Sequence, residues 1–258
     1  MIKVGFAGDM ARAYTSQQAR ASQRPPRSRA TTPAKQLRNA ELQQTGFARA
    51  SFEEDEQPAS LELLTQRLRN IEEGYGILPR DLQSDLAGER VRPWMFGDNP
   101  QFEASDLPSV RTVRKIHRLA RRFFKENLAE SSWNNDVHSK RLEWVMRDSP
   151  SSDDDLLDYR CRLCWGRRDP IDAIEFLPGI IVIKHDWYFV ATDLDRFGKA
   201  RTFERIPLGS TESILGIYKL SMSLLKLCQW VRDQYWPAFQ ADILNLEAQV
   251  ASGEAGAA

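Results

Sequence analysis

Residues 179–192 read Gly-Ile-Ile-Val-Ile-Lys-His-Asp-Trp-Tyr-Phe-Val-Ala-Thr, and this segment decides the fold class. Its first half contains a continuous β-branched run, Ile180 to Ile183, and its second half, Trp187 to Thr192, is rich in aromatic and β-branched residues. Such runs predict two strands, and His185-Asp186 between them predicts a tight turn. A third strand is expected at Arg201 to Ile206. The segment therefore predicts an antiparallel β-meander.

Helices are predicted on both sides of this meander. After it, Gly209-Ser210 is expected to open a long helix that reaches Val231 and ends at Trp236-Pro237. Its apolar residues cover more than one face, so it should be heavily buried. Before it, apolar spacing predicts three amphipathic helices, at about residues 60–73, 109–128 and 133–147. The middle helix is expected to bury Val113, Ile116, Ala120, Phe123 and Phe124. Helices, then strands, then a helix predict an α+β (mixed α/β) fold.

Composition bounds the domain organisation and the class of protein. The chain has 258 residues with 36 basic and 36 acidic side chains, so its net charge is zero and a globally basic nucleic-acid binder is excluded. We predict one domain at residues 59–246, a disordered basic and acidic tail at 1–58, and a short tail at 247–258. No apolar run is long enough for a membrane span, and no secretory signal is recognised. An intracellular protein is expected, with cytoplasm or nucleus left open.

A local basic patch is predicted on the second helix. Within 15 residues the sequence places seven cations and no acid, at steps of three and four that line one side of a helix. These are Arg111, Arg114, Lys115, Arg118, Arg121, Arg122 and Lys125. Such a stripe can follow a phosphate backbone of DNA or RNA. The alternative is a solvated helix face whose cations pair with acids elsewhere.

Two short motifs imitate metal sites. Cys161-Arg-Leu-Cys164 has the spacing of half a zinc site, but no second pair of ligands follows it. The segment from Asp193 to Glu204 imitates a calcium loop, but Phe197 stands at a ligand position and strands flank the segment, so a hairpin loop is expected. The residues alone therefore predict no metal and no other cofactor.

The segment from Glu130 to His138, Glu-Ser-Ser-Trp-Asn-Asn-Asp-Val-His, is unusual because it gathers an acid, a Trp, an Asn and a His at a helix start. Helical spacing predicts that Trp133 and Val137 pack inward, while Asn134 and His138 share a polar face. Without further information, a capped and partly buried helix start explains these residues.

This segment, together with residues 178–192 and 209–218, resembles the fungal PD-(D/E)XK nuclease-like domain. Residues 38–47 and 74–79 resemble its upstream part. The resemblance implies a restriction-endonuclease-like core in which a helix acid, a strand Asp and an acid-x-Lys strand bind Mg²⁺ and cleave phosphodiester bonds. Glu130 is the residue that matches the helix acid.

The other ligands implied by the resemblance are missing. None of the 36 acids is followed two places later by Lys. Asp148 to Pro178 spans 31 residues, whereas three strands and a helix need about 40. We therefore expect a break near residues 158–169, which leaves open a genuinely shortened relative or a gene model that lacks coding sequence.

The expected function is a nuclease-like domain without cleavage activity, with Glu130 as a vestigial acid. The alternatives are a non-catalytic nucleic-acid-binding module that uses the helix at 111–125, or a protein interaction scaffold. A sheet that has lost strands keeps an unpaired edge, so we also expect self-association and poor order from Ser149 to Phe176.

Overall fold

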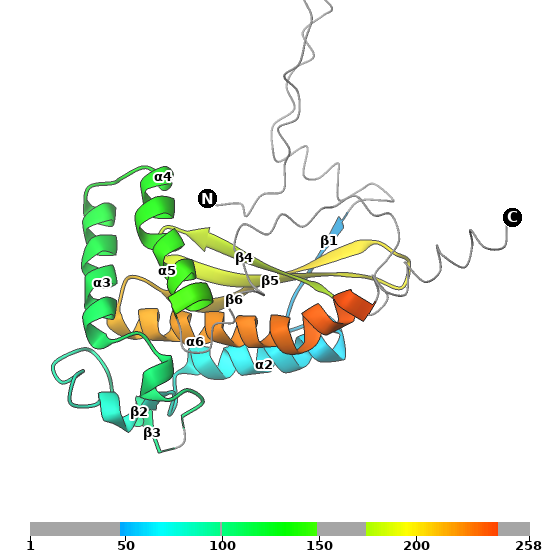
Figure 1. Cartoon of the computed structure of the whole chain (residues 1–258). Coiled ribbons are helices and arrows are strands. Elements are labelled where there is room, and N and C mark those ends of the chain that lie inside the picture. Colours follow the sequence, from blue (N-terminus) through cyan, green and yellow to red (C-terminus); the bar gives the residue numbers. More distant parts are fainter. Residues whose placement is uncertain (1–46, 99, 149–173, 242–258) are drawn as a thin grey trace, which may run out of the picture.

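The structure, a computed structural model, describes residues 47–98, 100–148 and 174–241. Over these residues the chain forms a mixed α+β fold, in which helices pack on a small mixed sheet (Figure 1). This confirms the predicted fold class. Most of both predicted tails, the Cys161–Cys164 pair, the expected break and nearly all of the segment from Ser149 to Phe176 lie outside the described residues. No helix in the described ranges combines the length and the apolar character needed to cross a membrane.

The elements form two sheets with helices between their strands along the chain. The larger sheet contains β1 (Phe47–Ala50), β4 (Leu177–Ile183), β5 (Asp186–Leu194) and β6 (Ala200–Ser210). The smaller sheet pairs β2 (Leu78–Pro79) with β3 (Phe96–Gly97). The α-helices are α2 (Ala59–Glu73), α3 (Val110–Lys125), α4 (Glu130–Trp133), α5 (Ser139–Glu143) and α6 (Ile214–Trp230). Turns of π-helix lie at Asn134–His138, Trp144–Asp148 and Val231–Tyr235, and 3₁₀ turns at Arg80–Leu82, Pro93–Met95 and Ala104–Asp106.

The larger sheet has the strand order β1-β6-β5-β4. Strands β4, β5 and β6 form the predicted antiparallel meander, with the first turn at Lys184-His185 instead of His185-Asp186. The sequence prediction starts the folded domain at residue 59, but β1 lies before it and pairs in parallel with β6. A strand of four residues is too short to show a period, and its partner is far away in the sequence. Among the described strands, β4 forms the other edge of the sheet.

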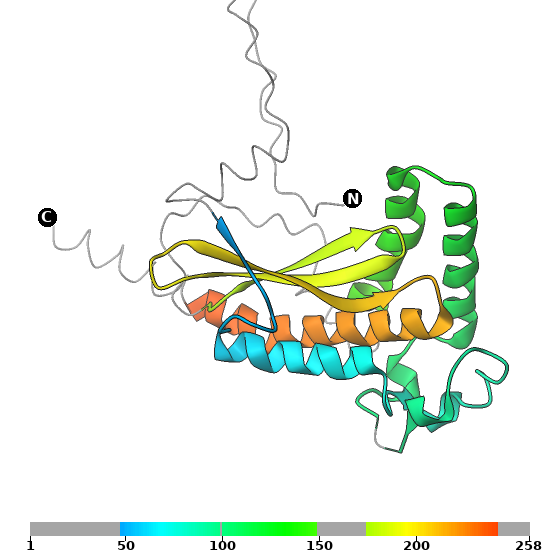
Figure 2. The same ribbon diagram turned by 180° about the vertical axis from the view of Figure 1, so that it is seen from behind.

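One face of this sheet contains the core. Along β5, alternate side chains (Trp187, Phe189 and Ala191) are fully buried. Helices α2 and α6 lie side by side under that face (Figures 1 and 2), and both contact β6. Helix α6 also contacts α3 and the π turn that follows α5, so side chains are buried nearly all around it, as predicted.

Helix α6 differs from the prediction at both of its ends. Gly209 and Ser210 still belong to β6, and the helix begins after Ser213, whose hydroxyl accepts a hydrogen bond from the Gly216 N–H. Ser210 and Ser213 are both suitable N-cap residues, so the sequence alone does not decide where the helix begins. Pro237 does not end the helix, because helical residues continue to 241 after a π turn at Val231–Tyr235. That wider turn accommodates a residue that has no N–H to donate.

Helix α3 also corrects one predicted core residue. Val113, Ala120 and Phe123 are buried as expected and Ile116 is half-buried, but the Phe124 side chain is 57 % exposed. Its ring lies at the end of α3 beside the β4–β5 turn, with its centroid 5.1 Å from that of His185. The turn leaves much of the ring open to solvent. The apolar pattern alone does not show that Phe123 is buried and Phe124 is exposed.

A cluster of rings fastens the helices to this turn. Trp133 of α4 stacks on His138 and meets His185 edge-on, with ring centroids 5.7 and 4.9 Å away. His138 is buried, which corrects the predicted polar face, and its Nε2 lies 2.8 Å from the Lys184 carbonyl oxygen. Asn134 Oδ1 lies 3.2 Å from His138 Nδ1, as the helical spacing suggested. Burial lowers the pKa of both His138 and His185 from the ordinary value.

The β6–α6 crossing yields a stability prediction. Gly209 has a φ of +139°, and a Cβ there would lie 2.4 Å from Leu220 N and 2.5 Å from Gly216 O. Gly209→Ala should therefore lower the free energy of unfolding by about 3 kcal/mol or more. Gly198→Ala is the matched control, since Gly198 has a φ of +75° with nothing within 4 Å, and should cost only about 1 kcal/mol. Urea unfolding measures both, and equal losses would contradict the close approach.

Candidate functional site

Glu130, the predicted helix acid, is the first residue of α4, and its side chain is exposed. The same helix turns Trp133 and Val137 inward, as predicted from their spacing. The Glu130 charge acts on the buried His138 ring, whose pKa it raises, although burial outweighs this effect. The ring cluster therefore fixes Glu130 at the end of the sheet where β4 turns into β5.

Within the described ranges, no three His, Cys, Asp or Glu side chains converge into a group that could hold a metal ion. Mg²⁺ needs near-octahedral oxygen ligands and binds proteins through more than one convergent oxygen donor, often with substrate phosphates. Glu130 offers one exposed carboxylate. The described residues do not fit the metal centre that the nuclease resemblance implies.

The helix that carries Glu130 also holds a buried cation. The Arg141 side chain is fully buried, and none of its three side-chain nitrogens has a hydrogen-bond partner among the described residues. Its guanidinium carbon lies 4.8 Å from the ring of Trp144, and burial lowers the pKa of Arg141 to about 9. The Tyr218 hydroxyl of α6 is likewise buried without a partner in the described part of the chain. A buried guanidinium normally has an acidic partner.

The predicted basic stripe lies on α3 as a continuous exposed face. All seven cations, from Arg111 to Lys125, are exposed and cover an arc of about 120° around the helix. Among described acids, Glu89 is the one that pairs with this face, through Arg114 Nε at 2.9 Å. Arg114 also donates to the Asp85 carbonyl oxygen. We call these seven residues the α3 basic face.

Lys184, which the sequence analysis did not single out, lies beside the C-terminal end of this face. Its Nζ lies over the Phe124 ring, 5.6 Å from the ring centre, and Lys184 is exposed. The structure brings Lys184 and Phe124 together across a long stretch of sequence, through the turn that His138 and His185 hold. No local sequence pattern predicts this contact.

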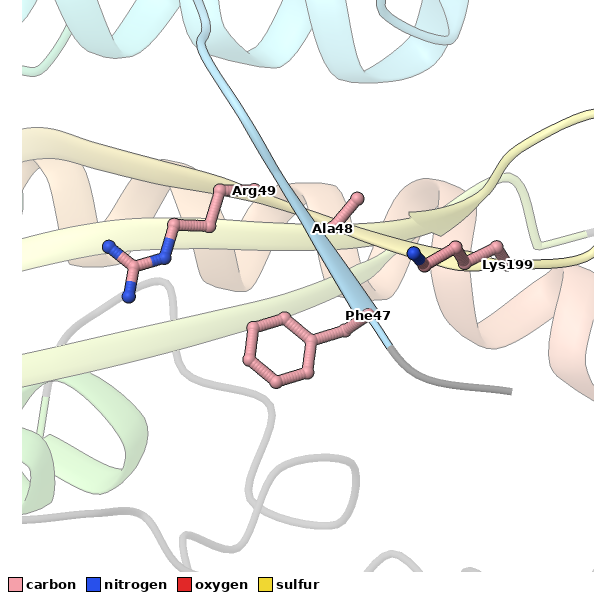
Figure 3. A pocket seen from close by; sticks show the side chains of 4 residues that line it. All are labelled: Phe47, Ala48, Arg49 and Lys199. Carbon is pink, nitrogen blue, oxygen red and sulfur yellow. The ribbon is translucent and has the colours of Figure 1, made fainter. Parts of the chain in front are cut away.

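A pocket of about 260 Å³ lies at the end of the sheet away from the β4–β5 turn, where β1 meets the start of β6 (Figure 3). Phe47, Ala48, Arg49 and Lys199 line it. Arg49 Nε lies 3.8 Å from Glu204 Oε1, so this cation of the pocket is paired with an acid. The pocket is separate from Glu130 and from the α3 basic face.

Comparison with known proteins gives one match. A family model described as the PD-(D/E)XK nuclease superfamily matches residues 81–164 and 159–236, so the two segments together span more than half of the chain. No curated protein and no solved structure matches. The match is to the superfamily and does not name a fungal branch. The small mixed sheet packed by helices agrees with this assignment, and the chain therefore belongs to the PD-(D/E)XK nuclease superfamily.

Proposed function

We propose that this chain is a PD-(D/E)XK domain that does not cleave phosphodiester bonds. The observation that carries the proposal is that no acid in the whole sequence is followed two places later by Lys. In active relatives, the resemblance implies, this acid binds the metal and this Lys orients the attacking water or stabilises charge on the phosphate. A metal-dependent cleavage site cannot be assembled from Glu130 alone.

The form of the family match supports this proposal. The two matched segments meet at residues 159–164, inside the interval where we expect the break. A continuous member would be expected to align through its catalytic strands without such a junction. We therefore propose that the strands carrying the missing ligands belong between the two segments.

Arg141 supports the same proposal by a different route. A fully buried guanidinium without an acidic partner costs several kcal/mol, and natural cores rarely keep one. Arg141 lies on α5, which follows α4 of Glu130 through the π turn at Asn134–His138. An acid lost with the catalytic strands explains why Arg141 has no hydrogen-bond partner among the described residues.

The first test is cleavage. Supercoiled and linear DNA incubated with the purified chain and Mg²⁺ or Mn²⁺ should be cut no faster than with a Glu130→Ala variant, because Glu130 cannot fix the metal. Glu126→Ala is the matched control, since Glu126 is an exposed acid just upstream. Cleavage that is lost in Glu130→Ala but kept in Glu126→Ala would overturn the proposal.

The second test determines whether Arg141 has an acidic partner anywhere in the chain. Arg141→Met should leave the melting temperature unchanged or raise it, because an unpaired buried charge is removed and the volume is kept. Arg201→Met is the matched control: Arg201 pairs at 2.5 Å with Asp193, whose side chain is 2 % exposed. Breaking that pair leaves a buried carboxylate and should cost about 3 kcal/mol. A comparable loss in Arg141→Met would mean that Arg141 has an acidic partner and that the core is not missing one.

A second function, binding of nucleic acid without cleavage, is favoured by the α3 basic face. Phosphate contacts need exposed cations at suitable spacing and do not need a metal. Six of the seven cations have no ion-pair partner among the described acids, which weakens the alternative of a paired surface. We propose that this face contacts the phosphate backbone of DNA or RNA.

Salt dependence tests this second function. Contacts with about five phosphates should give log affinity against log salt a slope near −4 to −5. Changing Arg118, Arg121 and Arg122 to Ala should weaken binding and reduce the slope by about 2 to 3. A variant with Arg67, Arg92 and Arg196 changed to Ala removes the same charge from other exposed sites and should change both much less. Equal effects in both variants would remove the α3 basic face from consideration.

A protein interaction scaffold, including self-association through the β4 edge, predicts a different outcome of the same experiment. Nucleic-acid binding would then be absent or independent of salt. Light scattering on the same samples would show assemblies that persist when the α3 cations are removed.

A further inference from the structure

Phe124 is an exposed aromatic side chain on an otherwise cationic part of α3. Its neighbour Phe123 is 2 % exposed and packs edge-on against Trp133, whereas Phe124 is 57 % exposed. Arg121 precedes it by three residues and Lys125 follows it directly. The end of the α3 basic face therefore offers an aromatic surface between cations.

The Phe124 ring is supported from the protein side. His185 lies behind it with a centroid distance of 5.1 Å, and His185 is held in turn by Thr211, whose Oγ1 lies 2.9 Å from its Nδ1. From His185 a chain of ring contacts runs through Trp133 and His138 to the buried Trp187. A ring fixed in this way loses little freedom when another planar group stacks on it.

Lys184 is held beside this ring at some conformational cost. Its φ of 53° lies in the left-handed region, which a β-turn normally gives to Gly or Asn. The hydrogen-bond contact between its carbonyl oxygen and His138 Nε2, at 2.8 Å, fixes this backbone. The result is a cation next to Phe124 that belongs to a different element from the α3 basic face.

Cations that bind phosphates, arranged around an open aromatic ring, match the chemistry of an unpaired strand. In a duplex the bases are stacked on each other and their faces are not accessible, whereas a single strand can place a base on an aromatic side chain. The cations then contact the phosphates on either side of that base.

We propose that Phe124 and Lys184 extend the α3 basic face into a binding site for single-stranded nucleic acid, with one base stacked on Phe124 and a phosphate paired with Lys184. The inference rests on the proposed nucleic-acid binding, because the α3 basic face supplies the other phosphate contacts. It adds a preference for single strands over duplexes.

The test uses fluorescence anisotropy with the full chain and three labelled probes: oligo-dT, oligo-U and a mixed-sequence duplex, each of about 16 nucleotides or base pairs. Phe124→Leu should weaken binding of the single strands about tenfold and of the duplex less than about twofold, because only the single strands lose a stacking contact. The two single strands separate DNA from RNA as the source of the base.

The matched control is Phe197→Leu. Phe197 is 79 % exposed in the β5–β6 turn at the other end of the sheet, where Arg196 lies 4.8 Å from its ring. It is also an exposed aromatic beside a cation, but it is far from the α3 basic face, and its loss should leave all three affinities unchanged.

Lys184→Asn tests the cation without disturbing the turn, since Asn tolerates the left-handed region. It should reduce the salt slope for the single strands by about 0.7, the value for one phosphate contact. Thermal unfolding of each variant verifies that the fold is kept, as expected for exposed side chains.

The outcomes separate the two proposals. If all probes bind with a steep salt slope but Phe124→Leu and Lys184→Asn bind like the unchanged chain, the single-strand site is wrong and the α3 basic face stands. If Phe124→Leu weakens duplex and single strands equally, stacking is also excluded. If the unchanged chain binds none of the probes in a salt-dependent manner, the proposed nucleic-acid function itself is wrong.

Discussion

The close backbone contact between the end of β6 and the first turns of α6 is the constraint on which the other contacts depend. A side chain at Gly209 or at Gly216 would overlap the backbone of the opposite element, so the strand and the helix touch without side chains between them. This brings Ile217 and Leu220 directly under the sheet. It also positions Thr211, whose N–H donates to the His185 carbonyl oxygen. Lys184 precedes His185, and its carbonyl oxygen contacts His138. His138 belongs to the π turn that follows α4, the helix of Glu130.

Cleavage and binding place different demands on such a scaffold. Cleavage needs several oxygen ligands within a few ångströms of one point, and those ligands come from different strands. Under the proposed function, the loss of two such strands removes cleavage completely. Binding to a polyanion needs only exposed charges along one surface, and α3 carries these on a single element that packs through Val113, Ala120 and Phe123. The proposed loss of the catalytic strands is therefore compatible with an unchanged α3 surface.

The predictable parts of this structure are those whose cause is local. The β-branched run at 180–183 predicts its strand, and the spacing of the cations in α3 predicts their common face, because both depend on the period of one element. Phe124 and Lys184 could not be placed in this way. Whether Phe124 is covered depends on where the β4–β5 turn ends, and the position of that turn depends on contacts with His138 and Thr211. Strand β1 was missed for the same reason, since its stability comes from pairing with β6.

Because the net charge of the chain is zero, an excess of acidic residues elsewhere balances the charge of the α3 basic face. Seven of the 36 basic residues lie between Arg111 and Lys125, so the rest of the chain carries 29 basic against 36 acidic residues. Residues 1–40 carry eight basic residues against one acid, so outside this segment and α3 the chain has 21 basic against 35 acidic residues. That remainder repels a polyanion on average, and the difference between it and α3 grows as the ionic strength falls. In the proposed binding mode, this separation of charge orients a strand along α3. The C-terminal end of that helix is where the exposed Phe124 ring and Lys184 lie, so in the proposed site the electrostatic attraction brings a strand to a position where a base can stack.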